Sequence, residues 1–207
     1  DASALLPTDP TVPPLDKAVS EFVAAARAEY PELYPAERDI SLEVHYKEFH
    51  PFQISWIIYL VSAVLLAVAW QTGGKKVYAT AWVAAIAAFL LHTYGFGLRV
   101  YLTGRPPVSH MYESVVWVSW GSVVFGFILE AIYRRRFILL AGSVVSVLCL
   151  IVADMAPTVL DSSIQPLEPV LRSNYWLTVH VLTITLSYSA FFLAWGLANI
   201  GLWFFLR

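Results

Sequence analysis

The histidines are the side chains of this sequence whose chemistry and position are most informative. Five are present: His45, His50, His92, His110 and His180. Imidazole binds metals and serves as an axial ligand of haem iron. His180 follows Tyr175 and Trp176 at the start of a long apolar run, and such aromatic residues suit a membrane interface. We expect His180 either to hydrogen-bond a neighbouring group or to bind haem iron, with aromatic side chains such as Trp176 packing on the macrocycle.

His92 lies within another apolar run, where an ionisable side chain is a functional candidate by default. Counted from Val77 it is about 22 Å along a helix, inside the membrane core near its outer face. For this residue a hydrogen bond to a neighbouring helix is favoured over metal ligation. His92 and His180 differ in depth by about 15 Å, and one iron needs both ring nitrogens about 2 Å away. A haem shared by these two histidines is therefore disfavoured, which weakens a b-type cytochrome interpretation.

The segment 99–113, RVYLTGRPPVSHMYE, could present arginine to an anion. Gly104 and the two prolines that follow Arg105 favour a turn and remove backbone donors. One interpretation is an ordinary connector whose arginines lie at the interface. The other is a fixed loop in which Arg99 or Arg105 holds a carboxylate through two parallel hydrogen bonds. Because haem carries two propionates, both arginines are candidate cofactor-binding residues.

The other reactive residues exclude several classes of protein. The single cysteine, Cys149, is incompatible with a disulfide framework, a cysteine-rich zinc site or an iron–sulfur cluster within this chain. It lies in an apolar run and is predicted to pack in the interior. No nucleophile or general base is evident, so no catalytic residue is assigned. The longest basic run is Arg134–Arg136, and without a basic domain no nucleic-acid partner is expected.

The elements that must position these residues are membrane-spanning helices. The 207 residues are 58% hydrophobic and 14% charged, against about 25% charged in soluble domains, and the mean hydropathy is +0.65. A span needs about 20 mostly apolar residues. Five runs qualify: about 53–70, 77–98, 114–132, 137–153 and 175–206. The predicted fold is an all-α polytopic membrane bundle of about five transmembrane helices. A soluble enzyme and an outer-membrane barrel are excluded.

Charge in the connecting loops predicts the orientation of the bundle. Lys75, Lys76 and Arg134–Arg136 lie in loops at one end, and with Arg207 they give that end six basic residues and no loop acid. The opposite end holds seven basic and fourteen acidic residues. Because cytoplasmic loops are enriched in Lys and Arg, the N-terminus is predicted outside and the C-terminus inside.

The fifth apolar run is too long for the bilayer. From Tyr175 to Phe205 it has 31 residues, about 46 Å of helix against a core of about 30 Å. Arg207 is expected to anchor its inner end. His180 should then project beyond the outer face of the core, unless the helix tilts strongly.

Residues 1–52 form the polar part of the chain, with ten acidic and four basic residues. We predict an extracytoplasmic segment that is mostly irregular. It contains one short amphipathic helix from Asp16 to about Tyr30, which could lie on the membrane or cover another domain. Residues 53–207 form the transmembrane region, which is expected to be incomplete at its C-terminus, as a piece of a longer protein.

Three segments carry a family resemblance. The stretches LLHTYGFGLRVYLTGRPPVSHMYESVVWVSWG and IQPLEPVLRSNYWLTVHVLTITLSY resemble the cytochrome c assembly proteins of the CcsA type, also called ResC. The stretch LEVHYKEFHPFQISWIIYL is similar to the segment just before the CcsA part of fused CcsB–CcsA proteins. Together they cover about residues 42–207.

The resemblance implies a role in system II cytochrome c maturation. Such proteins take haem b, their transported substrate, across the cell (inner) membrane. They attach it outside the cytoplasm to Cys-x-x-Cys-His motifs of apocytochrome c, as holocytochrome c synthases (haem lyases). A CcsB-type partner or fused domain is implied, in contact with membrane lipid. His180, in the context YWLTVH, matches the family's first external axial histidine. His110 stands where the family often has asparagine and receives no ligand role.

The chain also departs from the family pattern. The Trp-rich haem-binding segment, the second external histidine and the membrane histidine that follows it are absent and should lie beyond Arg207. Two rival functions stay open. One is a b-type haem membrane subunit that passes electrons to quinone. The other is a non-haem membrane transporter or scaffold module.

Overall fold

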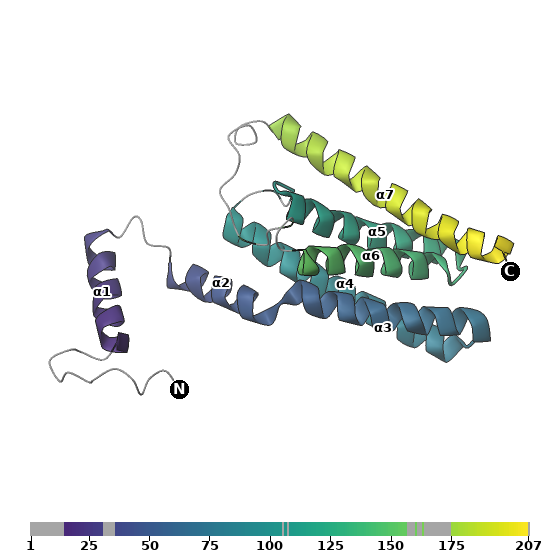
Figure 1. The fold of residues 1–207 in the computed structure, drawn as a ribbon, viewed down its shortest axis with the longest axis horizontal. Helices are drawn as coiled ribbons and strands as arrows, with labels where there is room; N and C mark the ends of the chain where they lie inside the picture. Colours follow the sequence, from purple (N-terminus) through teal and green to yellow (C-terminus); the bar gives the residue numbers. More distant parts are fainter. Residues whose placement is uncertain are drawn as a thin grey trace. The chain divides into compact units, whose positions relative to one another are not determined.

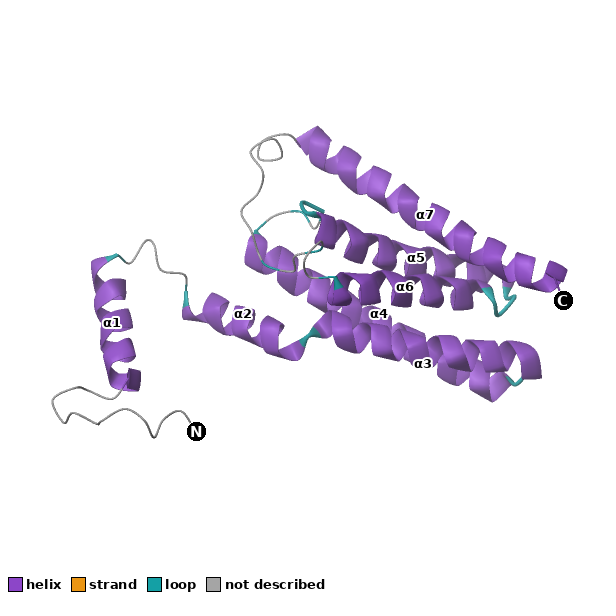
Figure 2. Ribbon diagram, viewed as in Figure 1, coloured by secondary structure: helices purple, strands orange, loops and turns teal. Residues whose placement is uncertain are grey.

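The computed structural model describes residues 15–30, 36–104, 106, 108–156, 160, 163 and 175–206. Within these residues the chain is helical and contains no strand (Figures 1 and 2). The helices are α1 (Leu15–Glu29), α2 (Glu37–Phe49), α3 (Pro51–Thr72), α4 (Lys75–Thr103), α5 (Met111–Tyr133), α6 (Ile138–Met155) and α7 (Tyr175–Leu206).

The five predicted spans correspond to α3, α4, α5, α6 and α7. Each is long and apolar enough to cross a membrane, and α2 continues almost directly into α3. The predicted all-α, multi-pass membrane fold is therefore confirmed. The largest difference in extent is at α4, which continues to Thr103, well past the predicted end.

Residues 1–42 and 43–207 form two separate compact units. The amphipathic helix predicted in the first unit is confirmed as α1, which has no buried residue. The expectation that the rest of the polar segment is mostly irregular was wrong for α2. This helix has Glu37 and Asp39 in its first turn and Lys47 in its last. These charges complement the helix dipole, so α2 is stabilised by local electrostatics without a regular apolar stripe.

In the second unit, α6 is the central helix. Figure 1 shows it between α3 and α5, and α7 lies against α5 and α6. The buried fraction of the most apolar window is 61% in α6 and 11% in α7. Thus α7 is attached along one side and exposes most of its surface. Its start stands apart from α5 in Figure 1, and the two helices converge along their length.

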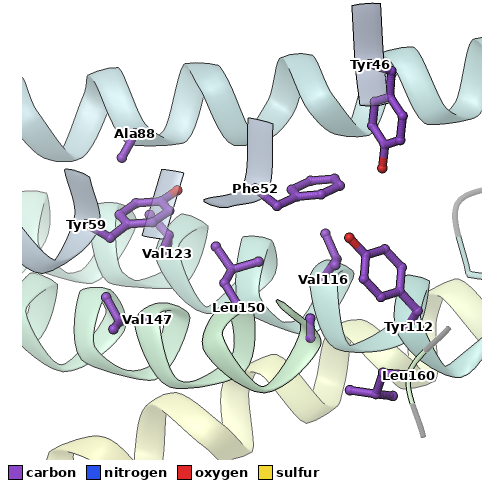
Figure 3. Close-up of a cluster of buried hydrophobic side chains, with 11 residues drawn as sticks. Tyr46, Phe52, Tyr59, Ala88, Tyr112, Val116, Val123, Val147, Leu150 and Leu160 are labelled. Carbon is purple, nitrogen blue, oxygen red and sulfur yellow. The ribbon is translucent and has the colours of Figure 1, made fainter. Parts of the chain in front are cut away.

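Aromatic and aliphatic side chains from α2 to α6, together with Leu160 after α6, form the main core (Figure 3). Its buried members are Tyr46, Phe52, Tyr59, Ala88, Tyr112, Val116, Val123, Val147, Leu150, Ala153 and Leu160. Figure 3 shows the rings of Phe52 and Tyr112 approaching from different helices. Their centroids are 6.3 Å apart with an edge-to-face orientation, the arrangement that aromatic pairs prefer.

Serines and glycines hold the helices close together. Ser62 Oγ donates to the Ala81 carbonyl at 2.9 Å, which links α3 to α4. Ser122 Oγ donates to the Ser189 carbonyl at 3.2 Å, which links α5 to α7. A Cβ added to Gly121 would lie 2.8 Å from Ser189 Cβ, so only glycine permits this approach of α7. Small residues and interhelical hydrogen bonds are the usual means of helix association in membranes.

The two basic loops lie at one end of the bundle. Arg136 Nη1 donates to the carbonyl of Ala69 near the end of α3, at 3.1 Å. Gly73, with φ +73°, closes α3 in the left-handed region and donates its N–H to the same carbonyl at 2.9 Å. The turn that leads into α4 at Lys75 and the segment Arg134–Arg136 are therefore neighbours. Which side of the membrane they face stays a prediction.

Candidate functional site

Arg99 is the centre of a buried polar cluster at the end of the bundle opposite the basic loops. Its Nε donates to Glu113 Oε1 at 2.9 Å, and both side chains are at most 5% exposed. Its Nη1 donates to the Tyr46 hydroxyl at 3.3 Å and its Nη2 to the Ser163 carbonyl at 3.1 Å. The guanidinium also lies 4.9 Å from the centroid of the Tyr112 ring. Arg99 therefore joins α2, α4, α5 and the segment before α7.

The second carboxylate oxygen of Glu113 holds the loop before α5. Glu113 Oε2 accepts from the Ser109 backbone N–H at 2.9 Å and from Ser109 Oγ at 2.6 Å. Arg99 thus already has a bound carboxylate, that of Glu113. Binding of a haem propionate by Arg99 stays a prediction, and Arg105 lies outside the described residues.

His180 lies on α7 at the same end of the bundle as Arg99. At the other end of α7, Phe204 packs edge-on against Trp70 near the end of α3, with ring centroids 5.1 Å apart. The basic loops are found there, so the beginning of α7 lies at the opposite end. The side chain of His180 is exposed. Trp176 is in the first turn of α7, and its side chain is outside the described part of the structure.

His92, a residue of α4, is fully buried and packs against α3. We expected a hydrogen bond to a neighbouring helix. Neither ring nitrogen makes one of ordinary geometry within the described residues, although the Val116 backbone lies close. The imidazole instead meets the rings of Phe52 and Tyr59, with centroids 5.5 and 6.1 Å away. Packing against aromatic rings therefore decides its position.

A second buried carboxylate, which the sequence reasoning missed, lies at the basic-loop end. Glu130 Oε1 accepts from the Tyr78 hydroxyl at 2.9 Å and from the Arg136 N–H at 2.6 Å. Glu130 Oε2 accepts from the N–H groups of Ile138 and Leu139 at 3.1 and 3.2 Å. Glu130 therefore accepts hydrogen bonds from backbone N–H groups in the first turn of α6. These groups have no acceptor within their own helix. A single acid within the apolar stretch FGFILEAIY was the signal available in the sequence.

We expect Glu130→Ala to destabilise the bundle strongly. It would leave the Tyr78 hydroxyl and the backbone donors of α6 without their acceptor, at about 1–3 kcal/mol for each buried group. Thermal unfolding in detergent measures the loss. Glu48→Ala, which removes an exposed carboxylate, is the control and should change stability by about 0.5 kcal/mol or less. Equal stability of the two variants would contradict the capping role.

The described residues contain no group of three or more His, Cys, Asp or Glu side chains placed to hold a metal ion. The end of the bundle that carries Arg99 nevertheless combines a buried ion pair, a loop residue held by Glu113 and an exposed histidine on a long helix. Fold and site thus define a class: a polytopic membrane helix bundle with a structured polar end.

The comparison with known families finds one match in the C-terminal half of the chain. Residues 108–207, which comprise α5, α6 and α7, match the family described as Cytochrome C assembly protein. This segment is therefore similar to the cytochrome c assembly family, in agreement with the resemblance seen in the sequence.

Several curated proteins are similar to the chain. Protein NrfI of Wolinella succinogenes is 36% identical over 104 residues, which cover 50% of this chain and 11% of that protein. Cytochrome c biogenesis protein CcsA of Nostoc punctiforme is 38% identical over 97 residues, 45% of this chain and 26% of that protein. CcsA of Guillardia theta is 33% identical over 118 residues, 56% of this chain and 38% of that protein. The chain thus spans well under half the length of these relatives.

Proposed function

We propose that this chain is part of a system II cytochrome c biogenesis protein that delivers haem across the membrane for attachment to apocytochrome c. The observation that carries the proposal is the match of residues 108–207 to the cytochrome c assembly family, because this segment contains His180. Relatives named as cytochrome c biogenesis proteins support the same role. His180 is the proposed axial ligand, and its position at the polar end of the bundle suits a ligand presented outside the core.

The substrate is haem b, and the acceptor is the Cys-x-x-Cys-His motif of an apocytochrome c. Each thioether forms when a cysteine S–H adds across a haem vinyl group, with sulfur and hydrogen bonding to its two carbons. The porphyrin supplies the reactive vinyls, and the protein positions the iron. Trp176 would pack on the macrocycle, and Arg99 and Arg105 would face the propionates. A CcsB-type partner or fused domain would complete the synthase.

The proposed orientation in the cell (inner) membrane puts the N-terminus outside and the C-terminus inside. Residues 1–52 are then extracytoplasmic, and residues 53–207 form the transmembrane assembly region. The clustering of Arg136 with the end of α3 supports this orientation, because one positive end is what the positive-inside rule requires. His180 and Arg99 would face the compartment in which apocytochrome c is matured.

Reporter fusions test the orientation. A reporter placed after Lys76 or after Arg136 should be cytoplasmic, and one placed within residues 160–170 should be external. The physical reason is the excess of basic residues in the loops at the proposed inner end. Alkaline phosphatase and green fluorescent protein give complementary readouts, each active on a different side. The opposite pattern would put His180 on the cytoplasmic side and overturn the proposed haem site.

Haem content and complementation test the function. The protein, expressed in a strain that lacks its own system II synthase, should purify with haem and restore covalent c-type cytochromes. A protein without haem absorbance would instead support the transporter or scaffold alternative. The b-type electron-transfer alternative would be supported if the protein holds haem stably, does not restore maturation, and its haem is reduced by quinol.

A further inference from the structure

Exposed cationic residues gather at the end of the bundle where α3 leads into α4 and α5 leads into α6. Figure 2 shows both connectors at this end, together with the end of α7. The bond from Arg136 Nη1 to the Ala69 carbonyl holds the two connectors together. The exposed residues, which we call the basic surface, are Lys75, Lys76, Arg134 and Arg135.

No carboxylate in the described part of the chain forms an ion pair with the basic surface. The helices α3, α4 and α7 contain no Asp or Glu. Glu130 is the acid of α5 at this end, and it is fully buried. Its two oxygens already accept from the Tyr78 hydroxyl and from three backbone N–H groups. The charge of the basic surface is therefore available to an anion from outside the protein.

The backbone of the arginine segment is unfavourable for arginine. Arg134 has φ +52° and Arg136 has φ +68°, in the left-handed region that favours glycine or asparagine. For Arg136 the side chain offsets this cost, because it bonds the Ala69 carbonyl and lies 5.5 Å from the centroid of the Tyr78 ring. Arg134 closes α5 through its backbone N–H alone, which any residue except proline could do. The fold therefore explains the side chain of Arg136 but not that of Arg134.

The lysines are also placed against a local preference. Lys75 and Lys76 lie in the first turn of α4, where the helix dipole disfavours positive charge. Aromatic residues surround this end: Tyr133 at the end of α5 is 61% exposed, and Trp203 near the end of α7 is 62% exposed. Exposed Tyr and Trp at the ends of apolar helices mark the level of the lipid headgroups. The basic surface thus lies at headgroup depth.

We propose that the basic surface binds the phosphodiester headgroups of anionic phospholipids. Arginine can hold two oxygens of one phosphate through parallel hydrogen bonds, and lysine adds a compact point charge. Bound headgroups would keep the start of α4 and the end of α5 at a fixed depth in the bilayer. The inference uses neither His180 nor haem, so it stands or fails separately from the proposed function. It holds on either side of the membrane.

Native mass spectrometry of the delipidated protein in a neutral detergent tests the proposal. Phosphatidylglycerol and phosphatidylcholine with identical acyl chains are titrated separately, and the Kd of the first bound lipid is measured. Each basic residue near an anionic headgroup contributes about fivefold, so a headgroup held by two of them should bind about 25-fold tighter than phosphatidylcholine. High salt should remove most of this preference, because the Debye length falls from about 10 Å at 0.1 M to about 3 Å at 1 M. Equal Kd values for the two lipids would overturn the proposal.

Two matched variants locate the lipid on the protein. Changing the four residues of the basic surface to glutamine should remove the preference for phosphatidylglycerol and leave the Kd of phosphatidylcholine unchanged. The control changes four basic residues of α1 and α2 to glutamine and should keep the preference: Lys17, Arg27, Arg38 and Lys47. A preference lost only in the control would move the lipid to α1 and α2 and overturn the proposal. Displacement of the lipid by an equal concentration of soluble glycerol 3-phosphate would indicate a free-phosphate site and also overturn it.

Arg134→Asn separates lipid binding from stability. Asparagine tolerates the left-handed backbone better than arginine, so thermal unfolding in lipid-free detergent should occur at the same or a higher temperature. The affinity for phosphatidylglycerol should nevertheless fall about fivefold, because one charge is lost from the basic surface. Opposite directions of these two effects would support a binding role for the side chain. A lower unfolding temperature together with unchanged affinity would make Arg134 a structural residue and overturn its part in the site.

Discussion

Replacing His180 with alanine is expected to remove most of the haem from the protein and to stop cytochrome c maturation. The substitution would empty one axial position of the iron. Losing a group that merely orients a metal ligand already costs about 10–100-fold in metal affinity, so losing the ligand should cost at least about tenfold. Added imidazole should partly restore the haem content and the maturation activity, because a small free ligand can enter the vacated space. Haem absorbance and covalent cytochrome c are the measurements.

His92→Ala is the matched comparison for this experiment. His92 is fully buried against Phe52 and Tyr59, so its loss should act through packing and should not respond to imidazole. A normal haem spectrum with full maturation activity in His180→Ala would contradict the ligand assignment. Imidazole rescue of His92→Ala instead would move the iron site into the bilayer and favour the b-type cytochrome alternative.

Breaking the Arg99–Glu113 pair is expected to have the largest effect on stability. The ion pair is almost completely buried, and removing one partner leaves a buried charge without its counter-charge, at a cost of about 3–5 kcal/mol. Arg99→Met should therefore lower the free energy of unfolding by about that amount. Combining it with Glu113→Gln should recover much of the loss, because a neutral pair replaces the unpaired charge. Thermal unfolding of both single variants and the double variant measures the coupling.

The same variants decide between the two roles predicted for Arg99. If Arg99 only fixes the loop before α5, haem retention should recover together with stability in the double variant. If Arg99 also binds a propionate, haem retention should stay low in the double variant although stability recovers. Arg105→Ala is a companion variant, and a loss of haem without a loss of stability would assign propionate binding to that arginine. If the stability losses of the two single variants add up to the loss of the double variant, Arg99 and Glu113 are not coupled.

The spans of this protein could be predicted because membrane insertion depends on local composition. Apolar runs of about 20 residues must be helical in lipid, since a helix satisfies its own backbone hydrogen bonds. The apolar runs around Leu66 and Leu150 could therefore form only helices. The clustering of Lys75 with Arg134–Arg136 followed from alternation of the helices. By contrast, α2 lacks a regular apolar stripe, so a prediction based on periodicity passed over it.

The sequence by itself determined that this is an all-α membrane bundle, and it singled out the histidines and the arginines of the segment 99–113 as candidate site residues. Its motifs also indicated the cytochrome c assembly family. Only the tertiary structure decided which partners those residues have. Arg99 meets Glu113, His92 meets aromatic rings, and Glu130 meets the start of α6, because these contacts depend on how separate helices rotate and cross. Composition and spacing specify each helix, whereas packing specifies which faces meet.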